Sequence, residues 1–237
     1  MKLFVTDYDN TLYINDVEIK KTNKDLRKLQ ERDTKIVIAT GRCLPSIKEE
    51  ILKHNIPFDY LSCADGSLIY DNNYNLVKEY KINNEIIELL MNYLVKDSIL
   101  EKIQVSYTHG YENYIDLTKS ISSFNLVVHK DNYTKELDKK FQYLKEKNKG
   151  YSFLSYLHDP IYYLCIKKKG VSKSKSIDYL KKKLKIKMKD IHVIGDADND
   201  FEMIKDYHGS CVSNATDNIK AISKNVYNKI SDYINII

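Results

Sequence analysis

The chain has 237 residues, of which 43% are hydrophobic and 30% charged, with only three Pro and seven Gly. This composition excludes collagen-like, proline-rich and disordered chains, and it suits one large domain or a core with an inserted subdomain. The net charge is +5, but acidic and basic residues are interspersed along the chain. Charge therefore does not indicate a nucleic-acid partner, and the basic stretch 181–189 is interpreted as the solvated face of a helix.

Cysteine spacing and the N-terminal sequence bear on the cellular compartment. The four cysteines show no spacing typical of metal ligands, so we expect reduced thiols. The chain reaches Asp7 before a signal-peptide core could form, and no apolar run approaches the roughly 18 residues of a membrane span. These features predict a cytoplasmic protein with no membrane partner, and we expect a monomer or weak homodimer.

Strand and helix patterns alternate at both ends of the chain. The first part predicts, in order, strand 2–6, helix 22–32 capped by Thr22, strand 35–39, helix 44–54 and strand 59–64. The last part predicts helix 172–184, strand 191–195, helix 198–207 and strand 209–213. This alternation is typical of an α/β fold with a doubly wound parallel sheet.

The middle of the chain has a different pattern. A hairpin of strands 67–70 and 76–82 is followed by helix 84–96, strands 102–108 and 111–117, helix 134–148, and strands 151–157 and 161–167. The order αββαββ predicts an antiparallel sheet backed by two helices; residues 118–133 are ambiguous, with 126–129 as a candidate edge strand. We therefore expect a catalytic core of residues 1–82 and 167–237 and an inserted domain of residues 83–166.

Polar side chains follow the predicted parallel strands at the edge where such sheets bind ligands. The motif Asp7-Tyr8-Asp9-Asn10-Thr11 ends the first strand, and Thr40-Gly41-Arg42 ends the second. Two acids at i and i+2 can divide labour, one attacking covalently and the other transferring protons. The Thr40 hydroxyl and the adjacent N–H could hold a phosphoryl oxygen. The structural alternatives are a polar turn in which Asp7 acts as a cap and a helix N-terminus capped by Thr40.

A third motif, Gly195-Asp196-Ala197-Asp198-Asn199-Asp200, follows strand 191–195. Helix capping accounts for one of its acids, but three carboxylates facing one another would repel without a cation. The pattern therefore predicts a hard divalent ion. A fourth motif, Gly170-Val171-Ser172-Lys173, opens a helix, and its lysine would neutralise part of this charge; the ordinary interpretation of one lysine among many is a solvated surface residue.

Together these motifs resemble the haloacid dehalogenase superfamily of phosphatases, in particular the Cof-type hydrolases. The resemblance rests on DYDNT at 7–11, ATGR at 39–42, GVSK at 170–173 and GDADND at 195–200, with softer similarities at 63–71 and 213–222. It implies a Rossmann-like core with an α+β cap inserted between the second motif, at 39–42, and the motif at 170–173, which is the third in chain order. The interval from Arg42 to Lys173 accommodates the αββαββ block, whereas one flap, one helix and one strand fill the interval from Asp9 to Thr40.

The resemblance also implies a role for each matching residue. Asp7 would be the nucleophile that forms an aspartyl-phosphate, and Asp9 would protonate the leaving oxygen and then activate water. Thr40 and Lys173 would bind the phosphoryl group, with Lys173 also keeping Asp7 ionised. Mg²⁺ would be held by Asp7, the backbone carbonyl of Asp9 and Asp196, with Asp200 orienting these ligands. The other implied contacts to phosphate or substrate come from Thr11, Gly41, Arg42 and Asn199.

Two residues depart from the family pattern. Asn10 replaces the Gly usual in DxDGT, and Asn tolerates unusual backbone angles better than most residues. Asp65 stands where the family often has Asn in its NGA-type loop, which adds a negative charge near the entrance of the site. We expect the first departure to be accommodated and the second to alter substrate preference.

These features predict a Mg²⁺-dependent phosphatase that acts on a small phosphorylated metabolite, such as a sugar phosphate or a phosphorylated cofactor. One alternative is a phosphomutase of the phosphomannomutase kind, which would share the acids and the cap position. Another is a metabolite-binding module that has lost catalysis, which the intact acid set disfavours. The substrate itself is not predicted, because cap loops without transferable motifs would recognise its leaving group.

Overall fold

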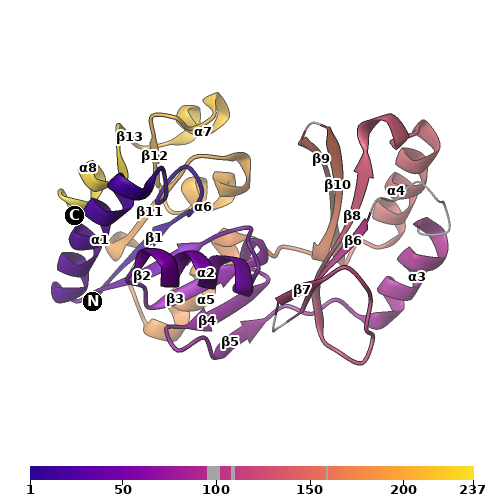
Figure 1. Ribbon diagram of the computed structural model, residues 1–237, viewed down its shortest axis with the longest axis horizontal. Helices are drawn as coiled ribbons and strands as arrows, with labels where there is room; N and C mark the ends of the chain where they lie inside the picture. Colours follow the sequence, from indigo (N-terminus) through magenta and orange to yellow (C-terminus); the bar gives the residue numbers. More distant parts are fainter. Residues whose placement is uncertain (95–101, 108–109, 159) are drawn as a thin grey trace. The chain divides into compact units, whose positions relative to one another are not determined.

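The computed structural model describes residues 1–94, 102–107, 110–158 and 160–237, which form two compact units (Figure 1). The first unit comprises residues 1–78 and 172–237, and the second comprises residues 79–171. The domain boundaries expected from the sequence differ from these by a few residues. The helix end expected at Lys96 and the strand end expected at Thr108 lie outside the described residues.

The first unit is built on an eight-stranded sheet in the order β13-β12-β11-β1-β2-β3-β4-β5. The strands β13, β12, β11, β1, β2 and β3 are parallel, and β4 is antiparallel to β3. The two strands of the predicted hairpin, β4 and β5, are neighbours at the edge of this sheet. The strands are β1 (Lys2–Thr6), β2 (Thr34–Ala39), β3 (Tyr60–Cys63), β4 (Leu68–Asp71), β5 (Leu76–Glu79), β11 (Ile191–Gly195), β12 (Ser210–Val212) and β13 (Val226–Tyr227).

Helices cover both faces of this sheet, which explains why its central strands are almost continuously apolar. Phe4 of β1 faces one apolar cluster with residues of α1, α2 and α8, whereas Leu3 and Val5 face another with residues of α5, α6 and α7. The helices are α1 (Asp16–Glu31), α2 (Leu44–His54), α5 (Lys173–Leu184), α6 (Phe201–Asp206), α7 (Asp217–Ile222) and α8 (Ile230–Ile234). The predicted doubly wound α/β core is therefore confirmed.

The start of α1 differs from the prediction. The helix was expected to begin at Thr22, but it begins at Asp16, because the side chain of Asn15 accepts hydrogen bonds from the N–H groups of Val17 and Glu18. Thr22 lies inside the helix, where its hydroxyl donates to the carbonyl oxygen of Glu18. The predicted helix 198–207 is also divided, into a short 3₁₀ turn at Asp198–Asp200 followed by α6.

The second unit is an antiparallel sheet, in the order β7-β6-β8-β10-β9, with two helices. Its elements are α3 (Asn84–Leu94), β6 (Lys102–Tyr107), β7 (Gly110–Glu112), β8 (Ile121–His129), α4 (Lys135–Lys147), β9 (Tyr151–His158) and β10 (Ile161–Lys168). Among the helices that the structure describes in either unit, none has the length and apolarity to cross a membrane.

Strand β8 corrects the expected αββαββ order to αβββαββ. The sequence indicated only an edge strand at 126–129, but β8 begins at Ile121 and pairs with both β6 and β10 in the middle of the sheet. Ser122, Ser123 and Asn125 interrupt the apolar pattern that would have revealed its first half. Two of these polar residues are nevertheless buried, since the strand has neighbours on both sides.

Candidate active site

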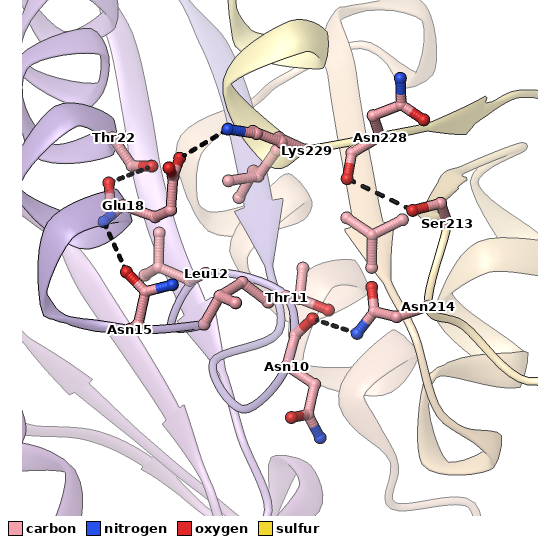
Figure 2. Close-up of a pocket in the computed structure, with 13 residues that line it drawn as sticks. Asn10, Thr11, Leu12, Asn15, Glu18, Thr22, Ser213, Asn214, Asn228 and Lys229 are labelled. Atoms are coloured by element: carbon pink, nitrogen blue, oxygen red, sulfur yellow. Dashed lines mark hydrogen bonds and ion pairs between the residues drawn. The ribbon is translucent and has the colours of Figure 1, made fainter.

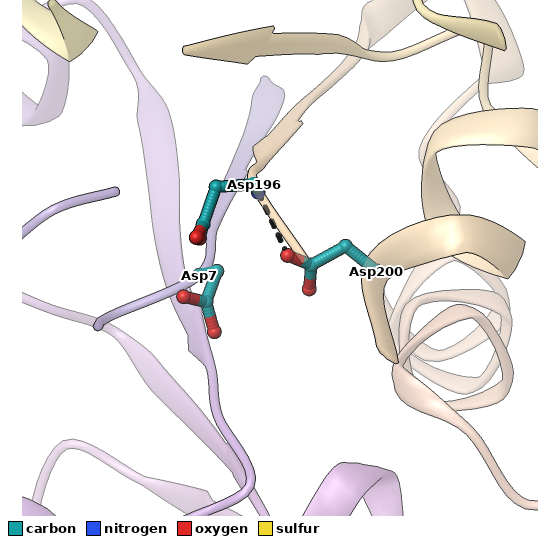
Figure 3. Close-up of side chains that lie close together, drawn as sticks. All are labelled: Asp7, Asp196 and Asp200. Atoms are coloured by element: carbon teal, nitrogen blue, oxygen red, sulfur yellow. Dashed lines mark hydrogen bonds between the residues drawn. The ribbon is translucent and has the colours of Figure 1, made fainter. Parts of the chain in front are cut away.

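Three carboxylates meet at the carboxyl edge of the parallel sheet (Figure 3). Asp7 follows β1 and Asp196 follows β11, and these two strands are adjacent and parallel, so both side chains emerge at the same edge. Asp200 joins them from the 3₁₀ turn before α6. Each carboxylate has an oxygen within 4.8 Å of the others, and all three residues are buried.

Lys173 is the positive charge of this cluster. Its Nζ lies 2.6 Å from Oδ1 of Asp7 and 2.7 Å from Oδ1 of Asp200, and the side chain is fully buried. Lys173 begins α5, which is capped by the hydroxyl of Ser172, so the helix start directs the lysine to the sheet edge. The interpretation of Lys173 as a solvated surface residue is therefore wrong.

Burial and charge shift the acid–base equilibria of these groups. Burial raises the pKa of Asp7 well above its ordinary value; Lys173 opposes this effect, and the neighbouring carboxylates of Asp200 and Asp196 reinforce it. Burial likewise raises the pKa of Asp196. For Lys173, burial would lower the pKa, but the carboxylates of Asp7 and Asp200 outweigh it and raise the pKa above its ordinary value.

Asp200 is fully engaged within the protein. Its Oδ1 accepts from Lys173, and its Oδ2 accepts from the backbone N–H groups of Asp196 and Ala197 at 2.9 and 3.1 Å. A Cβ at Gly195 would lie 2.5 Å from this Oδ2, so the close approach requires glycine there. Asp200 thus orients the loop that carries Asp196.

Asp7 and Asp196 each have one carboxylate oxygen that accepts a hydrogen bond from a neighbouring donor. Oδ1 of Asp196 accepts from the buried hydroxyl of Thr11 at 2.7 Å, and Oδ1 of Asp7 accepts from Lys173. The two carboxylates also interact with each other, and in the described part of the chain no other residue is hydrogen-bonded to Oδ2 of either one. Thr11 was predicted to contact phosphate or substrate, but its hydroxyl donates its hydrogen bond to Asp196 instead.

The donor set fits a divalent cation. With all three carboxylates ionised, one lysine would leave two negative charges uncompensated among buried side chains. Carboxylate oxygens are the ligands that Mg²⁺ prefers, and a cation beside them would favour their ionised forms. Asp7 and Asp196 are placed to bind such an ion, with Asp200 and Thr11 holding them in position.

The motif after β2 lies at the same edge of the sheet. Thr40 is fully buried, and its Oγ1 accepts from the N–H of Arg42 at 3.1 Å, so its own hydroxyl proton remains available to another acceptor. Asn199 lies near Gly41, since a Cβ at Gly41 would be 3.8 Å from Nδ2 of Asn199. The residues predicted to contact phosphate from the second and third motifs are therefore neighbours.

Asp9 has a different environment from the three clustered acids. Its carboxylate accepts two hydrogen bonds from the guanidinium of Arg42, at 2.9 Å from Nε and 2.7 Å from Nη2. The guanidinium also lies over the ring of Tyr8 and 3.6 Å from Glu50. The side chain of Asp9 is 48% exposed, in contrast to Asp7. This bidentate pair between the first and second motifs was not predicted.

Two contacts involve the residues that depart from the family pattern. Asn10 has a φ of 57°, in the left-handed region where Gly is usual and Asn is tolerated, and its carbonyl oxygen accepts from Nδ2 of Asn214 at 2.9 Å. Asp65 accepts a hydrogen bond from Asn199 at 3.1 Å. In the sequence, only the softer similarities at 63–71 and 213–222 point to Asp65 and Asn214. Their hydrogen bonds could not be predicted, because each one joins two loops that are far apart in the chain.

A cavity of about 430 Å³ lies beside the loop after β1, as Figure 2 shows, but outside the acid cluster. Polar residues that line it contact one another: Asn214 donates to the carbonyl oxygen of Asn10, and Lys229 forms a 3.1 Å ion pair with Glu18. Of the predicted site residues, the described lining includes Thr11 alone, and the hydroxyl of Thr11 faces Asp196. The chemistry is therefore assigned to the carboxylate cluster and not to this cavity.

Comparison with known proteins identifies the family. A sequence model of haloacid dehalogenase-like hydrolases matches residues 4–116 and 97–233. The chain belongs to this hydrolase family. The prediction of a Cof-type member of the haloacid dehalogenase superfamily is confirmed, and with it the assignment of the chain as a phosphatase-type enzyme.

Individual relatives are similar to this hydrolase over nearly their whole length. A Bacillus subtilis protein, 5-amino-6-(5-phospho-D-ribitylamino)uracil phosphatase YcsE, is 24% identical over 233 residues, which cover 93% of this chain and 87% of that protein. The fold resembles the crystal structure of TM0651 from Thermotoga maritima, with a TM-score of 0.79 and 21% identity; the match covers 100% of this chain and 97% of that chain. It also resembles the sugar phosphatase BT4131, with a TM-score of 0.75, 17% identity and coverage of 100% and 98%.

Proposed function

We propose that this hydrolase is a Mg²⁺-dependent phosphatase that cleaves a small phosphorylated metabolite through an aspartyl-phosphate on Asp7. The observation that carries the proposal is the buried carboxylate of Asp7, held at 2.6 Å by Lys173 beside Asp196 and Asp200. Phosphoryl transfer depends on positioning and on neutralising charge, and this cluster supplies both. The names of the Bacillus relative and of the sugar phosphatase favour a sugar phosphate or a phosphorylated cofactor as substrate.

Asp7 is suited to the role of nucleophile. One of its oxygens is fixed by Lys173, which also favours the ionised carboxylate, and the side chain keeps a second oxygen for attack. A bond forms from Asp7 to phosphorus while the bond from phosphorus to the leaving oxygen breaks. Lys173 and the hydroxyl of Thr40 would donate to the phosphoryl oxygens. Mg²⁺, held by Asp7, the backbone carbonyl of Asp9 and Asp196, would neutralise phosphoryl charge when bound.

Asp9 is proposed as the proton donor and acceptor of the two steps. It gives a proton to the leaving oxygen, and then takes one from the water that attacks the aspartyl-phosphate, which releases inorganic phosphate and restores Asp7. Both carboxylate oxygens of Asp9 accept from Arg42, so at least one of these contacts must be released before Asp9 can carry a proton. Arg42 is therefore proposed to position Asp9 between turnovers.

A screen of phosphorylated metabolites for phosphate release tests the proposal. We expect no activity after chelation, recovery with Mg²⁺ and inhibition by Ca²⁺, which accepts more ligands at longer range and can draw both oxygens of Asp7 into coordination. Mg²⁺ should also raise the melting temperature of the wild type but not that of Asp196→Ala. Full activity in excess chelator would disprove the metal-dependent mechanism, and an isomeric ester in place of free phosphate would identify a mutase.

A further inference from the structure

Asp65 is an acid of the first unit to which the proposed mechanism gives no role. It lies in a 3₁₀ turn, Ala64–Gly66, directly after β3. Its φ of 50° and that of Ala64, 49°, are left-handed, so the turn has an unusual backbone path. A side chain held in such a strained turn next to the acid cluster warrants a functional explanation.

The turn is fastened on two sides to the proposed phosphate-binding motifs. The N–H of Asp65 donates to the carbonyl oxygen of Thr40 at 3.1 Å, and the N–H of Ala64 donates to that of Arg42 at 2.9 Å. Gly66 packs so closely against the backbone of Ser172 that a Cβ there would collide with it. Asp65 is thus held between the end of β2 and the helix start that carries Lys173.

The carboxylate of Asp65 contacts two of the residues predicted to bind phosphate or substrate. Its Oδ1 accepts from Nδ2 of Asn199 at 3.1 Å, and a Cβ at Gly41 would lie 3.3 Å from the same oxygen. Among the residues with described structure, no hydrogen bond reaches its Oδ2. The residue is only partly buried, and its charge also acts on Lys173.

The chemistry of a carboxylate at this place discriminates among leaving groups. An ionised Asp65 can accept a hydrogen bond but cannot donate one, so it stabilises a bound hydroxyl or ammonium group. It repels a second anionic group such as a carboxylate, and repulsion of this kind is an effective source of specificity. The Asn usual at this position in the resembled family would carry no charge and would permit both.

We propose that Asp65 is a specificity-determining residue that selects phosphomonoesters whose leaving group carries a hydroxyl or amino group and rejects those with a second anionic group. This inference rests on the proposed phosphatase function, because it concerns the substrate class of the same site. It places part of the discrimination in the first unit, on the turn after β3, in addition to the contribution expected from the inserted unit.

Three esters and two variants test this role. The esters are glycerol 1-phosphate, which offers hydroxyls, 3-phosphoglycerate, which adds a carboxylate, and 4-nitrophenyl phosphate, which offers neither. Asp65→Asn removes the charge but keeps an acceptor for Asn199 and suits the left-handed backbone; Asp65→Gly removes the side chain. Asp178→Asn makes the same charge change on α5, where Asp178 pairs with Lys181 and Lys182, and serves as the matched control.

For the wild type we expect kcat/KM for glycerol 1-phosphate to exceed that for 3-phosphoglycerate by about tenfold or more, the scale of one hydrogen bond to a charged group. Both Asp65 variants should reduce this ratio to about threefold or less. The change in kcat/KM for 4-nitrophenyl phosphate measures any loss that acts through Asn199 and is common to all three esters. Asp178→Asn should leave the ratio unchanged.

Two results would overturn the assignment. An unchanged ratio in Asp65→Asn, together with an equal loss on all three esters in Asp65→Gly, would show that Asp65 only holds Asn199. A wild-type preference for 3-phosphoglycerate would show that the carboxylate does not repel a second anion. Calorimetry measures the ratio of the binding constants of glycerol 1-phosphate and 3-phosphoglycerate without turnover. Absence of hydrolysis would refute the phosphatase proposal alone, whereas a binding ratio unchanged in the Asp65 variants would refute the role of Asp65.

Discussion

The two units of the molecule bury different kinds of side chain. The first unit buries Asp7, Asp196, Asp200 and Lys173 at one edge of its parallel sheet. In the described part of the second unit the buried polar residues are serines, apart from Glu79 at its boundary, whose side chain is 8% exposed and accepts from Ser122 at 2.9 Å. Burying charge costs free energy that an apolar core avoids, so the cluster in the first unit is explained better by the proposed chemistry than by a contribution to stability.

The sheets of the two units reflect the same division. Parallel strands place their carboxyl ends side by side, so residues from β1, β2 and β11 that are distant in sequence can act on one phosphoryl group. The antiparallel strands of the second unit alternate their ends and share no such edge; its inner layer joins Leu126, Leu164 and Phe141 into an apolar core. The predictions below test this separation of chemistry from packing, beginning with the largest expected effect.

Asp7→Asn should reduce kcat by roughly 10⁴-fold or more, because an amide neither attacks phosphorus readily nor offers an anionic oxygen. The fold should persist, since Lys173 keeps its 2.7 Å contact with Asp200. Phosphate release and thermal unfolding by circular dichroism measure the two effects. Activity above about a hundredth of wild type would contradict the nucleophile assignment. The matched control is Asp131→Asn in the second unit, an exposed acid whose loss should change kcat by less than about twofold.

Asp9→Asn should lose both leaving-group protonation and water activation, a reduction of roughly 10² to 10⁴-fold in kcat. The loss should be larger for alkyl phosphates than for aryl phosphates, because poor leaving groups need the proton most. Rates across a series of esters with graded leaving-group acidity provide the measurement. Equal losses for aryl and sugar phosphates would count against Asp9 as the acid.

Replacing residues 79–171 by a short Gly/Ser linker removes the second unit and tests whether the first can act alone. Each unit has its own apolar clusters, and Tyr179 of α5 donates to the carbonyl oxygen of Val77, so the end of β5 stays anchored. We expect a folded protein whose turnover of 4-nitrophenyl phosphate falls by roughly ten- to a hundredfold, because a cap of the kind that the family resemblance implies would exclude water from the site.

The truncated protein should also lose most of the discrimination among larger metabolites and keep the preference that depends on Asp65. A truncated protein that folds but retains the wild-type ranking across several metabolites would show that the second unit does not set specificity. Failure to fold, seen by circular dichroism, would refute the independence of the first unit.

Leu164→Ala should affect stability and leave the chemistry almost unchanged. Leu164 is fully buried in β10, and its truncation should cost about 2–5 kcal/mol in the free energy of unfolding of the second unit. Hydrogen exchange should show lower protection in residues 79–171 but not in the first unit, with kcat for 4-nitrophenyl phosphate changed by less than about twofold. Leu157→Ala, at a position that is 47% exposed, is the control and should cost less than about 1 kcal/mol. Loss of protection in both units would show that they unfold together.

Local patterns were sufficient for much of the fold. Strands β1 and β11 and helix α2 have the predicted bounds, because continuous apolar runs and a proline in the first helical turn are local signals. The first turns of α1 were missed, because the cap at Asn15 precedes a polar stretch. Strand β13 and helix α8 were not predicted; they are short, and their stability comes from packing against α1 and β12.

The amino-acid sequence by itself determined which residues could do chemistry, and it placed three of the four motifs at one edge of the sheet, since those three follow strands of recognisable pattern. Only the tertiary structure decided how these side chains pair. It places Lys173 between Asp7 and Asp200, Arg42 on Asp9, and Asp65 on Asn199. These contacts join loops separated by up to 166 positions, and they depend on strand order and side-chain rotamers, which no local periodicity encodes.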